Sequence, residues 1–71
     1  MRSKEEIQKL IIYYLTDNNM TVEEMSRIIG AAKPSIYRWI NGTNQITNKY
    51  YLKLVKLFDG YIPPKEYNLF E

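Results

Sequence analysis

The chain has 71 residues, 45% of them hydrophobic, and its ten basic and eight acidic side chains leave a formal net charge of +2. This length allows one small hydrophobic core, and the composition is typical of a globular rather than a disordered chain. Cysteine and histidine are absent, which excludes disulfides, zinc fingers, thiol nucleophiles and imidazole bases. No phosphate-binding glycine loop or nucleophile elbow accompanies the carboxylates, so we expect no enzyme, no cofactor and no small-molecule ligand.

The apolar runs of the chain are short. The longest, residues 10–15, falls well below the roughly 20 residues that a membrane-spanning helix needs. The first residues are acidic where a secretory signal needs a basic start. We therefore expect a soluble cytoplasmic protein with no membrane partner.

The first half of the chain predicts two helices, each opened by a capping box. Ser3 with Glu6, and Thr21 with Glu24, have the spacing at which each side chain caps the other residue's backbone amide. Apolar stripes at helical spacing follow. Their members are Ile7, Leu10, Ile11, Tyr14 and Leu15, then Val22, Met25, Ile28 and Ile29. We expect helices over residues 4–15 and 22–29, the second closed by Gly30 in left-handed geometry.

A third helix is expected over residues 34–40, because Pro34 suits a first helical position. Its inner face carries Ile36, Trp39 and Ile40, and Asn41-Gly42 ends it. Ser26 is small where the second helix must come close to the third.

A fourth helix is expected after a loop of residues 43–46, with Thr47 as its N-cap and Asp59-Gly60 as its end. Its core stripe consists of Tyr51, Leu54, Val55 and Phe58. The tail, residues 61–71, is rich in apolar side chains. It either folds back onto the first and fourth helices or forms a dimer contact, and Pro64 can start one more short helix.

These elements predict an all-α fold, a compact bundle of four to five short helices. It forms one domain over residues 1–71, with a core over about residues 4–58. Residues 21–42 place two short helices around a turn at Gly30, which is a helix-turn-helix. Since the inner face of the third helix is committed to packing, its outer face is left to enter the major groove of DNA.

The stretch over residues 25–42, MSRIIGAAKPSIYRWING, resembles the helix-turn-helix of the Cro and phage-repressor (XRE-like) family. Gly30, Ile36, Trp39 and the Asn41-Gly42 end all match in register. The resemblance is strong over residues 21–42, extends in helix count over residues 4–58, and leaves the tail unmatched. It implies a lambda-repressor-like bundle and a sequence-specific, double-stranded DNA-binding transcription regulator, Cro-like or repressor-like, of phage or mobile-element origin.

The family reads bases with the start and outer face of its recognition helix. Carried over, this implies base contacts from Lys33, Pro34, Tyr37 and Arg38, of which Arg38 can pair with O6 and N7 of guanine. The implied phosphate contacts are Thr21, Ser35, Asn41, Thr43, Asn44, Gln45 and Lys49. Relatives commonly bind as dimers, so the implied partner is a pseudo-palindromic operator bound by a homodimer.

The chain departs from the family pattern before and after the recognition helix. Ala31-Ala32 stands where many relatives have Ser or Thr, which leaves Lys33 or water to satisfy the first amides. The loop after the helix has few basic residues, so we expect a shallow salt dependence. This sparse basicity also keeps an alternative open: a protein-interaction module with the same fold, such as an antitoxin, an anti-repressor or a phage inhibitor. In that case Tyr37 and Arg38 are simply exposed to solvent.

Overall fold

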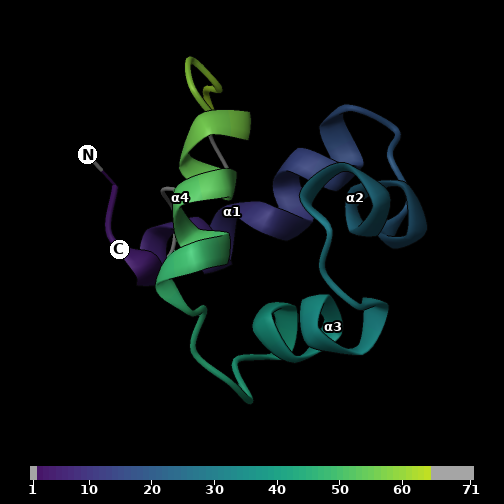
Figure 1. The fold of residues 1–71 in the computed structure, drawn as a ribbon. Helices are drawn as coiled ribbons and strands as arrows, with labels where there is room; N and C mark the ends of the chain where they lie inside the picture. The colour runs from purple at the N-terminus through teal and green to yellow at the C-terminus, as the bar shows by residue number, and fades with distance from the viewer. Residues whose placement is uncertain (1, 65–71) are drawn as a thin grey trace.

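A computed structural model describes residues 2–64, which form four α-helices and no strand (Figure 1). The helices are α1 (Lys4–Asp17), α2 (Val22–Ile29), α3 (Lys33–Asn41) and α4 (Asn48–Leu57). The predicted all-α bundle is therefore confirmed. No helix in this part of the chain has the length and apolarity to cross a membrane. The additional helix expected from Pro64 onward lies outside the described residues.

Helices α1, α2 and α4 all begin directly after the predicted N-caps, Ser3, Thr21 and Thr47. Ser3 Oγ accepts from the Glu6 amide at 3.2 Å, and Thr21 Oγ1 accepts from the Glu24 amide at 3.1 Å, with both capping boxes complete. Thr47 is the N-cap of α4 by its backbone, but its side chain makes no capping bond.

Helix α1 ends two residues later than expected. The Thr16 hydroxyl donates to the Ile12 carbonyl at 2.8 Å, and the Asn18 amide closes the last turn on Tyr14 at 3.1 Å. Polar residues just beyond the expected end thus add hydrogen bonds to the last turns of the helix.

The core contains most of the predicted apolar stripes. The residues less than a tenth exposed are Ile7, Leu10, Ile11, Leu15, Met25, Ile29, Ala31, Ile36, Trp39, Ile46, Leu54 and Phe58. Ile28 departs from the prediction, since 55% of its surface is exposed. It faces a hollow between α2 and α4 that no described segment fills. Other expected core members, Tyr14, Val22, Ile40, Tyr51 and Val55, are half-buried against this cluster.

The start of the tail folds back onto α1 and α4, which was one of the two arrangements expected for the tail. The Tyr61 ring lies 5.2 Å from that of Tyr14, and its hydroxyl donates to Asp17 at 2.6 Å. The Arg2 guanidinium donates to the carbonyls of Phe58 and Tyr61. Ile62, in contrast, is 83% exposed. The apolar residues Tyr67, Leu69 and Phe70 lie outside the described residues.

Candidate nucleic-acid interface

Helices α2 and α3 form one unit because their connecting turn is held from several sides. The turn has three residues, Gly30 to Ala32, and Gly30 adopts the predicted left-handed conformation with φ of +73°. Ser26 Oγ donates to the Ala31 carbonyl at 2.5 Å. From α4, Lys53 Nζ donates to the Ile29 carbonyl at 3.0 Å. Ser26, which was predicted to lie close to the third helix, thus also hydrogen-bonds to the turn. Lys53 caps the C-terminal end of α2.

Helix α3 presents two opposite faces. Its inner face buries Ile36 completely and Trp39 to within 4% of its surface. At a rotation of about 100° per residue, positions 34, 37, 38 and 41 fall on the other side, whereas position 33, three residues before Ile36, opens the helix beside the inner face. The side chains at these positions, Lys33, Pro34, Tyr37, Arg38 and Asn41, are all exposed. In Figure 1, α3 lies along one edge of the molecule, so this outer face meets solvent rather than another helix. Three of the four predicted base-reading residues, Pro34, Tyr37 and Arg38, therefore share one accessible face, and Lys33 is exposed at the start of the helix.

The N-terminal end of α3 carries no side-chain cap. Ala32 is its N-cap, the first turn contains no acidic residue, and the amides of Ser35 and Ile36 both donate to the Ala32 carbonyl. Lys33 does not complete this end, contrary to the expectation. Its ammonium lies 3.4 Å from the Glu23 carboxylate, and an ammonium can only donate, so it cannot accept from a helix amide.

The predicted phosphate contacts divide into two groups. Thr21 is committed to α2, since its hydroxyl and its amide both bond to Glu24. The carboxylates of Glu23 and Glu24 also occupy the first turn of α2, so an anion there would meet like charge. The remaining residues lie at α3 or after it, exposed except for half-buried Ser35: Ser35, Asn41, Thr43, Asn44, Gln45 and Lys49.

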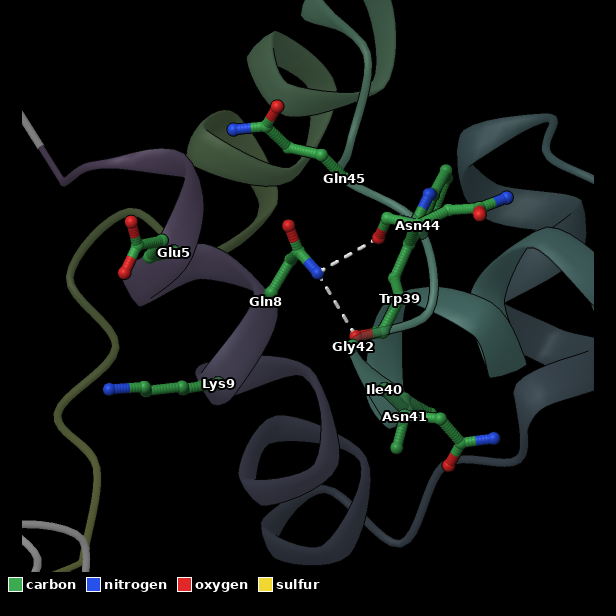
Figure 2. Close-up of a pocket in the computed structure, with 9 residues that line it drawn as sticks. All are labelled: Glu5, Gln8, Lys9, Trp39, Ile40, Asn41, Gly42, Asn44 and Gln45. Carbon is green, nitrogen blue, oxygen red and sulfur yellow. Dashed lines mark hydrogen bonds between the residues drawn. The ribbon is translucent and has the colours of Figure 1, made fainter.

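Two residues that organise this second group were not predicted as functional. Ile46, placed in the loop, is 1% exposed and anchors the α3–α4 loop, residues 42–47, in the core. Gln8 of α1 reaches the same loop: its Nε2 donates to the carbonyls of Trp39 and Asn44, both at 3.1 Å (Figure 2). Its Oε1 accepts from the Ile46 amide at 3.3 Å. A lone apolar residue in a polar loop was the available signal for Ile46. No sequence pattern marked Gln8.

Charge is distributed unevenly around α3. Residues 25–58 contain basic side chains and no acidic one. The basic residues are Arg27, Lys33, Arg38, Lys49, Lys53 and Lys56. The acidic residues of the described part flank this stretch: Glu5, Glu6, Asp17, Glu23, Glu24 and Asp59. The small net charge thus conceals a basic segment that contains α3 and α4, and charge patterning along the sequence is the signal that reveals it.

The chain has no match among protein-family models, curated proteins or solved structures. The resemblance to Cro-like proteins accordingly depends on residues 21–42 themselves. Any function assigned to the chain has to be argued from its own geometry and charge.

Proposed function

We propose that this protein is a sequence-specific double-stranded DNA-binding transcription regulator that inserts α3 into the major groove. The observation that carries the proposal is the division of α3 into a buried face, with Ile36 and Trp39, and an exposed face at an edge of the molecule. A helix held in this way can enter a major groove about 12 Å wide without losing its packing.

The exposed face carries side chains suited to base recognition. The Arg38 guanidinium can donate two parallel hydrogen bonds to O6 and N7 of guanine. Tyr37, which is 53% exposed, offers a ring and a hydroxyl at the same face. Pro34 supplies an apolar contact for a thymine methyl group, and Lys33 adds a positive charge at the start of the helix.

Contacts to the DNA backbone are proposed for the residues that follow α3. Asn41, Thr43, Asn44 and Gln45 are neutral hydrogen-bonding side chains, and Lys49 on α4 is the first cation that follows them in sequence. Neutral contacts release no condensed counterions, so the affinity should depend only weakly on salt. We do not include Thr21, because its hydroxyl is engaged by Glu24.

By analogy with Cro-like proteins, we extend the proposal to a homodimer that binds a pseudo-palindromic operator in the cytoplasm. Each α3 would read one half-site, with half-sites about 34 Å apart, one turn of the DNA helix. Repression would follow from occupation of a promoter. The assignment to a phage or mobile element rests on the same analogy.

The decisive test is a selection from a random duplex library, followed by sequencing, at near-physiological salt. Wild type is expected to enrich a two-fold symmetric motif, whereas a single half-site would indicate a monomer. A double variant, Tyr37→Ala with Arg38→Ala, serves as the matched control. It keeps the packing residues and should fold, but it lacks two base-reading side chains and should enrich nothing. Failure of folded wild-type protein to enrich any motif would refute the proposal.

A second candidate function, docking of a protein partner, is favoured by one observation. The hollow between α2 and α4 has a volume of about 370 Å³ and is lined by Ile28, Ile29, Lys53, Lys56 and Leu57. An apolar floor beside lysines suits an acidic, apolar segment of another protein. Ile28→Gln separates the candidates, because it should leave DNA affinity unchanged and weaken binding of such a partner.

A further inference from the structure

The Gln8 side chain connects three parts of the molecule that are distant in sequence. From α1 it bonds to the carbonyl of Trp39 in α3, to the carbonyl of Asn44 and to the amide of Ile46. It does so at the side of an open hollow of about 420 Å³ between α1 and the end of α3, with both carbonyls in reach of its single nitrogen (Figure 2).

The other bonds of the α3–α4 loop are local. The Gly42 amide donates to Trp39, and the amides of Thr43 and Asn44 both donate to the Arg38 carbonyl. These bonds close the C-terminal end of α3 but do not hold the backbone from Asn44 to Ile46 in place. Gln8 holds both ends of that path, since it donates to one residue and accepts from the other.

Glutamine is suited to this task by its chemistry. Its amide offers two donors and an acceptor without charge, and the structure uses both functions. A glutamate at the same position would retain the acceptor but would turn a carboxylate oxygen toward two carbonyls. A lysine would have no acceptor for Ile46.

We propose that Gln8 is a positioning residue that preorganises the α3–α4 loop for the phosphate backbone of DNA. This inference rests on the proposed function. Neutral contacts from Thr43, Asn44 and Gln45 are individually weak, so the entropy of ordering a loose loop would offset much of what they contribute. A loop that is already fixed by Gln8 and by the buried Ile46 avoids most of that loss.

The test compares Gln8→Met with Lys9→Met in the full chain. Lys9 lines the same hollow from the neighbouring position of α1, so it controls for the substitution itself. Hydrogen exchange of the Ile46 amide reports on the loop without DNA and should be about tenfold faster in Gln8→Met only. Gln8→Glu, which keeps the acceptor and removes both donors, is the second variant, and a thermal melt verifies that each protein is folded.

The DNA measurement uses two duplexes of equal length, the selected site and a scrambled one. Gln8→Met should bind both about 3- to 10-fold more weakly and leave their affinity ratio unchanged, because phosphate contacts carry no sequence information. Each Kd is calculated from the concentration of binding-competent protein, so that a smaller folded fraction in a variant does not appear as weaker binding.

Two results would overturn the inference: unchanged affinity for both duplexes, or a loss confined to the selected site. An unchanged exchange rate at Ile46 would overturn it as well. If wild type binds neither duplex, the proposed function itself fails, and the Ile46 exchange rate still shows whether Gln8 orders the loop.

Discussion

The two helices of the helix-turn-helix begin in opposite ways. Helix α2 opens with Thr21 as N-cap, a complete capping box and two acidic residues in its first turn. Helix α3 opens with Ala32, which offers no side-chain bond, and has no acidic residue in its first turn. At the start of α2 the protein supplies a side-chain cap and two acidic side chains that favour the helix dipole, whereas α3 has neither: Pro34 brings no amide, and Ser35 turns its amide to the Ala32 carbonyl.

This difference shows how each helix is stabilised. Helix α2 gains from local caps and from Lys53 at its C-terminal end. Helix α3 is held by its packing, by the left-handed Gly42 that ends it and by the hydrogen bond from Gln8 to the Trp39 carbonyl. Because the open start of α3 lies in the stretch without acidic residues, an anion can approach it without meeting a carboxylate on α3. The Glu23 carboxylate of α2 does reach the start of α3, where it is paired with Lys33, and it is also paired with Arg27.

The largest expected effect comes from removing the packing of α3. Trp39→Ala should lower the free energy of unfolding by about 3–5 kcal/mol, because it deletes a large buried side chain from a helix that lacks an N-terminal cap. Tyr37→Ala, the matched change on the outer face, should cost less than about 1 kcal/mol. Urea denaturation measures both values. Equal losses would contradict the two-faced description of α3.

The next largest effect concerns DNA affinity. Arg38→Ala should weaken binding to the selected site by about 1–3 kcal/mol and reduce its preference over a scrambled duplex. The thermal midpoint should not change, since the side chain is exposed. Arg27→Ala, an exposed arginine on α2, is the control. Should both substitutions weaken binding equally without loss of preference, Arg38 contributes charge and reads no base.

Adding the missing cap tests the open start of α3 directly. Ala32 already has the extended backbone of an N-cap, with φ of −67° and ψ of 143°. Ala32→Ser and Ala32→Asp should therefore each raise the free energy of unfolding by about 1 kcal/mol. Only Ala32→Asp should also weaken DNA binding, because it places a carboxylate where a phosphate would approach. A titration with the selected duplex decides this, and equal affinities of the two variants would argue against anion approach at α3.

The smallest effect is a dependence of stability on acid. The backbone hydrogen bond from Thr21, followed by the bond from its side chain, lowers the pKa of Glu24. A carboxyl whose folded pKa lies below its unfolded pKa stabilises the fold above the unfolded value, and this stabilisation is lost as pH falls through the folded value. Glu24→Gln should flatten that part of the curve of denaturation midpoint against pH. A curve identical to wild type would show that the ionisation of Glu24 contributes nothing measurable, since a glutamine can still close the capping box.

Much of the fold could be predicted because its signals are local. The capping boxes, Gly30 and Gly42 act on neighbouring backbone groups, and the helical period put Ile36 and Trp39 on one face. That same period grouped Pro34, Tyr37 and Arg38 on the opposite face. The prediction was wrong for Ile28. The helical period identifies the apolar face of α2, but it does not tell how much of that face the neighbouring helices cover.

The sequence by itself determined where the helices start and turn and which face of α3 packs, since side chains within four residues make those choices. Only the tertiary structure decided which polar groups meet across the bundle. Gln8 reaches Ile46, Lys53 caps α2, and Arg2 bonds to the carbonyls after α4. Such pairs join residues 24 to 59 positions apart, and no short-range pattern encodes them, because their geometry exists only once the core has brought the helices together.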